Sequence, residues 1–129
     1  MTQDELKKRS KQFALRMMSM VSTLPSSREA DVIARQILRS ATSVRANYRA
    51  ACRARSKADF ISKITIVEEE ADETLFWMEL IAERNLIKSD RLSELMKEGT
   101  ELVAIFTAAG KTAKLHQRNN PQSTIRNPK

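Results

Sequence analysis

Arginine gives this sequence its clearest chemical pattern. Residues 35–57, RQILRSATSVRANYRAACRARSK, are rich in arginine and contain no carboxylate. Guanidinium groups make bidentate contacts with phosphates and carboxylates, a geometry that ammonium groups cannot match. The segment therefore has three candidate roles: a basic solvent-exposed face, a row of partners for acids elsewhere in the fold, or a strip that binds phosphates.

Residues suited to catalysis or metal binding are few. His116, the only histidine, falls near the end of the last predicted helix, so no Ser–His or Cys–His pair is indicated. Cys52, the only cysteine, lies at the edge of an apolar helical face and is interpreted as a small core residue. The acidic run VEEEADE lacks the Glu-x-x-His partners of a di-iron bundle site. Since a glycine-rich phosphate loop is also missing, we predict no enzyme activity, metal or cofactor.

The elements that position these residues are predicted to be helices. The chain has 129 residues, 41% of them apolar and 30% charged, a composition typical of one soluble globular domain. With only 2 Gly and 3 Pro, long uninterrupted helices are favoured over a sheet with many turns. No apolar run approaches the ~20 residues that cross a bilayer, and the charged N-terminus lacks a signal core. We therefore expect a cytoplasmic protein without a membrane partner.

The net charge of +7 is unevenly distributed along the chain. Residues 1–57 carry 13 Lys/Arg and 4 Asp/Glu (+9), residues 58–104 carry 5 and 12 (−7), and residues 105–129 carry 5 and none (+5). Folding these segments against one another would neutralise part of the charge. Less positive charge is then available to an outside partner than the local values suggest.

Cap motifs and apolar spacing predict four helices. TQDE at the N-terminus is a capping box, and SSRE and SKAD are similar start signals for the second and third helices. Apolar residues three or four apart follow each motif and assign Phe13, Met17, Phe60 and Phe106 to the core. The predicted helices span residues 2–25, 26–55, 56–84 and 89–117. They form an all-α, antiparallel up-down-up-down four-helix bundle over residues 1–117, followed by a disordered basic tail at 118–129.

Five arginines of the second helix fall on one side of it. On a helical wheel of about 100° per residue they share an arc of roughly 80°, opposite the apolar residues. They therefore do not face the core of their own bundle. The five are Arg28, Arg35, Arg39, Arg49 and Arg53.

Two interpretations of these arginines remain open. In the first, which we favour as the main role, part of the set pairs with acids within or between subunits. The acids expected on the third helix are Glu68, Asp72, Glu79 and Glu83. In the second, left open as an additional role, the arginines contact nucleic-acid phosphates. Base-specific recognition is not supported, because interleaved exposed aromatics and a recognition motif are both missing.

The third helix has a second apolar side, roughly opposite its core stripe. A helix that is apolar on two sides is either centrally buried or covered by another chain, and each helix of a four-helix bundle has an outer face. A subunit interface is therefore predicted, with Trp77 as its anchor. Alternatively, Trp77 lies over a neighbouring helix of its own chain. The residues of this side are Ile66, Phe76, Trp77 and Leu80.

The central part of the chain resembles a known family. RQILRSATSVRANYRAACRARSKADFISKI followed by EEEADETLFWMELI is similar to small bacterial four-helix-bundle proteins of the 23S ribosomal RNA intervening-sequence family. The segments RSATSV, ANYR, RARSK-DFI and EADET-W-ELI are specific in combination, and a weaker collinear similarity extends to about residue 115. The resemblance implies an antiparallel bundle that assembles into a ring-like homopentamer.

The resemblance also implies a setting for the function. Some members are encoded inside intervening sequences of ribosomal RNA genes. A related branch serves as the accessory protein of diversity-generating retroelements, where a basic pentameric barrel binds nucleic acid and a reverse transcriptase. Arg45 stands where a glycine is common, and Ala50 stands where a glutamate is common. Both differences make the second helix more positive, which favours nucleic-acid binding.

The leading hypothesis is a non-enzymatic, oligomeric bundle that binds nucleic acid as an accessory subunit of a reverse-transcriptase or ribonucleoprotein complex. The alternative is a structural protein–protein scaffold whose arginines serve only subunit contacts. Lys111, Lys114, Arg118 and Arg126 are expected to assist binding. The predicted phosphate contacts are Arg28, Arg35, Arg39, Arg45, Arg49 and Arg53.

Overall fold

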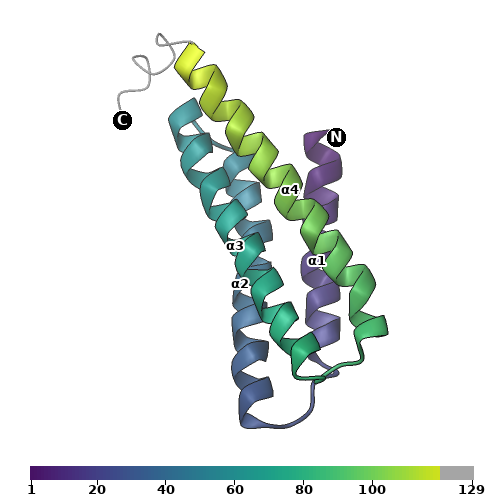
Figure 1. Ribbon diagram of the computed structural model, residues 1–129. Helices are drawn as coiled ribbons and strands as arrows, with labels where there is room; N and C mark the ends of the chain where they lie inside the picture. Colours follow the sequence, from purple (N-terminus) through teal and green to yellow (C-terminus); the bar gives the residue numbers. More distant parts are fainter. Residues whose placement is uncertain (120–129) are drawn as a thin grey trace.

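Four long helices run alternately in opposite directions, as the sequence predicts (Figure 1). The computed structural model describes residues 1–119, and this part of the chain contains no strand. The four helices therefore confirm the expected all-α class. They are α1 (Gln3–Val21), α2 (Arg28–Cys52), α3 (Lys57–Glu83) and α4 (Ser89–Asn119).

Side-chain caps fix the starts of the first three helices. Thr2 and Glu5 form the predicted capping box: the Glu5 amide donates to Thr2 Oγ1 over 3.1 Å, and the Thr2 amide donates to Glu5 Oε1 over 2.8 Å. Ser56 accepts from the Asp59 amide over 3.0 Å and caps α3, also as predicted. The cap of α2 is Ser27 and not the preceding serine of the SSRE motif, because Ser27 Oγ accepts from the Ala30 amide over 3.2 Å.

Two helices end earlier than predicted. α1 stops at Val21 and not at Pro25, because the amides of residues 23 and 24 bond three residues back and tighten the chain into a turn. α2 stops at Cys52 for a similar reason, since the Arg53 amide bonds to the Ala50 carbonyl. The next helix begins at Lys57, and the second helix does not reach residue 55 as expected. At the other end of the chain, residues 118 and 119 belong to α4, and the rest of the predicted tail lies outside the described residues.

The core lies along the centre of the bundle and joins all four helices. Phe13, Met17 and Phe106 are fully or almost fully buried, as predicted, whereas Phe60 is only partly buried near the start of α3. The ring of Phe106 packs against that of Tyr48, with centroids 5.4 Å apart. Burial raises the pKa of the Tyr48 hydroxyl well above its usual range, with Cys52 beside it as a second cause.

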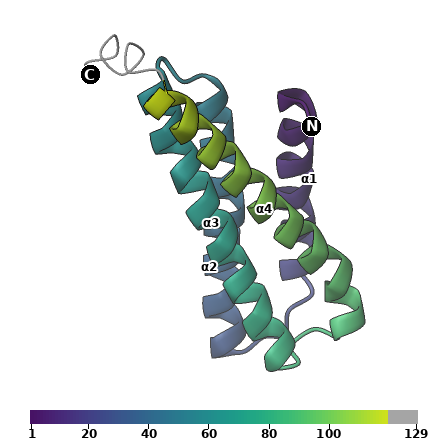
Figure 2. The same ribbon diagram turned by 45° about the horizontal axis from the view of Figure 1, so that its top comes forward.

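The helices are not packed equally closely. α2 packs along α3, and α3 packs along α4, whereas α1 packs mainly on α2. α4 crosses diagonally, from beside α1 near its own start to beside the start of α3 at its end (Figures 1 and 2). Arg9 joins α1 to α4 through ion pairs with Glu98 (2.6 Å) and Glu101 (3.0 Å). Within the described residues no helix is both long and apolar enough to cross a membrane.

Candidate nucleic-acid-binding surface

The arginine row is defined as the five residues that the helical wheel places together. All five side chains are exposed, because Ile33, Ile37 and the other buried residues of α2 occupy the opposite side. Four of the five are on α2 itself. Arg53 is the C-cap of α2 and lies just beyond the regular helix, whereas the sequence predicted a longer helix that includes it. The arginine row consists of Arg28, Arg35, Arg39, Arg49 and Arg53.

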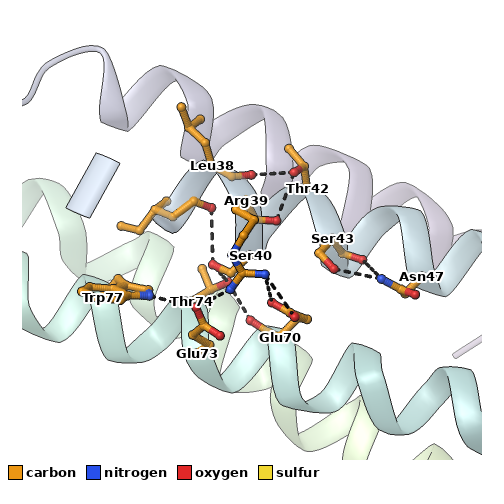
Figure 3. Close-up of polar contacts among 11 residues, drawn as sticks. Leu38, Arg39, Ser40, Thr42, Ser43, Asn47, Glu70, Glu73, Thr74 and Trp77 are labelled. Atoms are coloured by element: carbon orange, nitrogen blue, oxygen red, sulfur yellow. Dashed lines mark hydrogen bonds and ion pairs between the residues drawn. The ribbon is translucent and has the colours of Figure 1, made fainter. Parts of the chain in front are cut away.

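One member of the row is held by acids of α3 (Figure 3). Arg39 pairs with Glu70 over 3.1 Å and with Glu73, and these two carboxylates raise the pKa of its guanidinium, with the Glu73 hydrogen bond as the larger cause. The Trp77 indole N–H also donates to Glu73 Oε2 over 3.1 Å. Hydrogen bonds from Trp77 and then from Arg39 lower the pKa of the Glu73 carboxyl.

The pairing acids are not those predicted from the sequence. Within the described residues, none of Glu68, Asp72, Glu79 and Glu83 forms an ion pair with the row. The register of α3 against α2 determines which acids reach the row. It is seen in the contact between the buried Thr74 hydroxyl of α3 and Ser40 Oγ of α2, which lie 2.8 Å apart. Glu70 and Glu73 flank this contact on the α2 side. Glu68 instead lies beside α4, where its Oε1 is 3.5 Å from the position a Cβ would take at Gly110.

The other four members of the row have no acid partner in the part of the chain that the structure describes. Arg28, Arg35, Arg49 and Arg53 form no ion pair with a carboxylate of residues 1–119. On α2 the row extends about 32 Å from its first member to Arg49, at about 1.5 Å per residue. Internal pairing therefore involves one arginine of the row, and the positive charge of the other four faces solvent.

Arg45, also predicted as a phosphate contact, lies at the margin of this exposed surface. It lies about 80° around α2 from Arg35, on the side away from Arg39. Its side chain is only partly exposed, and its Nη1 is buried with no hydrogen-bond partner among the described residues. A guanidinium nitrogen in this position cannot contact a phosphate from outside without a rearrangement.

A groove lies where α2 turns into α3. It has a volume of about 960 Å³ and is lined by Arg49, Arg53, Arg55 and Lys63, together with small side chains. Lys63 pairs with Asp59, whose carboxylate also accepts from the Arg55 amide over 3.2 Å. The hydrogen bond from Lys63 is the larger cause, and the bond from the Arg55 amide the second, of a lowered pKa of the Asp59 carboxyl. We call this feature the α2–α3 groove.

The end of α4 adds basic residues near the same end of the bundle. Lys111, Lys114 and Arg118 are exposed on its last turns, which lie beside the start of α3 in both views (Figures 1 and 2). The fourth predicted helper, Arg126, lies outside the described residues. The groove, the end of the row and the end of α4 thus lie at the same end of the bundle.

The second apolar side of α3 is partly exposed. Ile66 is 38% exposed and Phe76 is 49% exposed, whereas Trp77 and Leu80 are partly buried against the core. The rings of Phe76 and Trp77 meet edge to face with centroids 4.9 Å apart. Trp77 therefore packs against the core of its own bundle, and Phe76 is the more exposed aromatic side chain on this face.

Replacing Arg39 by glutamine is expected to lower the free energy of unfolding near pH 7 by at most about 1 kcal/mol, because both ion pairs are at the surface. A lowered carboxyl pKa contributes stability above its unfolded value and loses it as pH falls through the folded value. The difference from wild type should therefore shrink near pH 3. Urea unfolding at both pH values measures it.

Arg35→Gln is the matched control for this measurement, since Arg35 is exposed and unpaired within the described residues. It should leave the unfolding free energy unchanged at both pH values. An Arg39→Gln effect that is equal at the two pH values would contradict the assigned role of Glu73.

The fold and the surface define a small all-α bundle protein with an exposed arginine face. The chain belongs to the 23S rRNA-intervening sequence protein family, whose model matches residues 3–108. It is similar to a protein of unknown function from the S23 ribosomal protein family of Bacteroides thetaiotaomicron VPI-5482. The two are 34% identical with a TM-score of 0.79, over 86% of this chain and 99% of the other. No curated protein matches the sequence.

Proposed function

We propose that this protein is a non-enzymatic bundle that binds nucleic acid through the phosphate backbone. The observation that supports this most directly is the set of four exposed arginines of the row that have no acid partner among residues 1–119. Guanidinium groups spaced along one side of a helix suit a regular array of phosphates. The contacts carry no base information, so binding is expected to be independent of sequence.

The basic surface also has a favourable shape for a strand. The row follows one side of α2 and ends in the α2–α3 groove, and the basic end of α4 lies at the same end of the bundle (Figure 1). The total charge of +7 leaves a positive surplus after all internal pairing. Long-range attraction of a polyanion follows from this surplus and weakens with added salt.

The competing function is a scaffold whose arginines bind only acids of neighbouring subunits. The pairing of Arg39 with Glu70 and Glu73 lies within one chain, so it gives Arg39 a structural role without supporting contacts between subunits. The remaining members of the row have no carboxylate partner among residues 1–119, so their guanidinium groups stay available to an outside partner. We therefore place structural pairing at Arg39 and phosphate binding at the other four positions.

The proposal includes self-assembly, for which the outer face of α3 is the expected interface. Ile66 and Phe76 are the large apolar groups that it leaves exposed, and a second copy would remove both from water. The family resemblance supports a pentamer, about five times the 14.7 kDa monomer mass. Light scattering should give this mass, and Phe76→Glu should reduce it to that of one chain. A wild-type monomer at micromolar concentration would contradict the assembly.

The biological setting that we propose is an accessory subunit of a diversity-generating reverse transcriptase or a related ribonucleoprotein complex. It is supported by the resemblance and by the added positive charge of α2. A reverse-transcriptase gene with a variable repeat beside the gene for this protein would support it, and co-purification of the two gene products would test it. Failure of the two proteins to associate would remove this setting and leave phosphate binding unaffected.

Fluorescence anisotropy with labelled duplex and single-stranded oligonucleotides tests nucleic-acid binding itself. At about 50 mM salt, wild-type protein should bind oligonucleotides of unrelated sequence with similar affinity, and about 200 mM salt should weaken each complex at least tenfold. Negligible binding at the lower salt concentration would overturn the proposed function in favour of the scaffold.

A further inference from the structure

The α2–α3 groove gathers positive charge on a concave surface, whereas the rest of the arginine row lies on a convex helix. Its volume of about 960 Å³ falls within the usual range of ligand sites, about 300–1,000 Å³. Arg49, Arg53 and Arg55 all line it. Three alanines in the lining leave space between these long side chains, so a compact anion can enter.

The charge of the groove is not neutralised from within. Among residues 1–119, Asp59 is the only acid in its lining, and its carboxylate is already engaged by the Lys63 ammonium and the Arg55 amide. The three guanidinium groups form no ion pair with a carboxylate of residues 1–119. An anion that enters the groove therefore need not displace an internal carboxylate.

Helix dipoles add little net charge to the α2–α3 groove. The C-terminal end of α2 and the N-terminal end of α3 meet at the groove, and their partial charges of about −0.5 and +0.5 offset one another. Three full guanidinium charges therefore determine which ligand is favoured. Compact groups with more than one negative charge benefit most from such a cluster.

We propose that the α2–α3 groove binds the terminal phosphate of a nucleic-acid strand, an inference that rests on the proposed function. A terminal phosphomonoester carries about −1.5 to −2 charges near pH 7 and offers three oxygens, whereas each internal phosphate carries one charge. A strand that lies along α2 reaches the groove where the row ends. The concave surface encloses the free end of the strand, and the convex face of α2 contacts only its side.

The test compares three single-stranded oligonucleotides of one sequence, with a 5′-phosphate, a 3′-phosphate or hydroxyl groups at both ends. Wild-type protein should bind at least one phosphorylated form about tenfold more tightly than the hydroxyl form, as expected for one added charge-assisted contact. Equal affinity for all three would overturn the groove proposal and leave general nucleic-acid binding intact. Binding of none of them at low salt would overturn both.

Two charge-matched double variants locate the effect. Arg53→Gln with Arg55→Gln changes the groove, and Arg28→Gln with Arg35→Gln removes the same charge from the far part of the row. The groove variant should reduce the ratio of affinities to about one, whereas the row variant should weaken all three complexes and keep the ratio. A ratio that survives in the groove variant would overturn the proposal. All four side chains are exposed, and circular dichroism verifies that both variants fold.

Discussion

Replacing four arginines of the row by glutamine should lower the affinity for duplex nucleic acid by roughly 10²–10⁴-fold at about 50 mM salt. Each phosphate contact releases nearly one condensed counterion, so at this salt concentration each contributes up to about tenfold. Arg39 is left unchanged, because its ion pairs with α3 occupy it and support the fold. Anisotropy titration measures the loss. The substitutions are Arg28→Gln, Arg35→Gln, Arg49→Gln and Arg53→Gln.

A second quadruple variant separates position from total charge. It carries glutamine at four exposed basic positions of α1 and α4 that form no ion pair in the described residues, so its net charge falls by the same amount. Its affinity should stay within about tenfold of wild type, because only long-range attraction is reduced. Equal losses in the two variants would show that net charge alone governs binding. The control positions are Lys8, Lys11, Arg16 and Lys97.

Replacing Gly99 by valine is expected to lower the free energy of unfolding by about 1–3 kcal/mol, the usual cost of adding carbon atoms to a packed core. Gly99 is buried on α4 between two neighbouring helices. A Cβ added there would lie 2.8 Å from Leu75 Cδ2 and 3.3 Å from Phe13 Cζ. The loss should appear even though valine has a better helix propensity than glycine. Urea denaturation measures it.

Gly110 on the same helix provides the control with the opposite sign. A Cβ there would meet Glu68 and Ile64 only at ordinary contact distances of 3.5 and 3.6 Å. Gly110→Ala should therefore raise the unfolding free energy by about 0.5–1 kcal/mol, the helix-propensity difference between the two residues. If valine at Gly99 were as stable as wild type, the close approach of α4 to its neighbours would be contradicted.

Local patterns in the sequence predicted most of the fold. Thr2, Glu5 and Ser56 form the expected caps, because a capping motif involves residues that are close along the chain. The helix ends were less accurate, since the ends of α1 and α2 depend on turns whose bonds compete with the helical ones. The role of Gly99 could not be predicted, because it depends on side chains from two other helices.

The candidate site was predictable only where it belongs to one helix. A helical wheel of α2 correctly placed the arginine row opposite the core, because that property depends on α2 alone. It could not identify the acids of α3 that bind Arg39, since the choice of Glu70 and Glu73 requires the register between two helices. The α2–α3 groove was missed for the same reason, because Arg55 and Lys63 belong to neither the wheel of α2 nor its apolar pattern.

The salt dependence of duplex DNA binding tests most directly whether the exposed arginines contact phosphates. The logarithm of the affinity should fall linearly with the logarithm of salt concentration, with a slope of about −0.9 for each phosphate contact. Removal of the four arginines should therefore make the slope shallower by about 3–4 units, while the charge-matched control keeps nearly the slope of wild type. A quadruple row variant with the slope of wild type would contradict the assignment of this surface to phosphate binding.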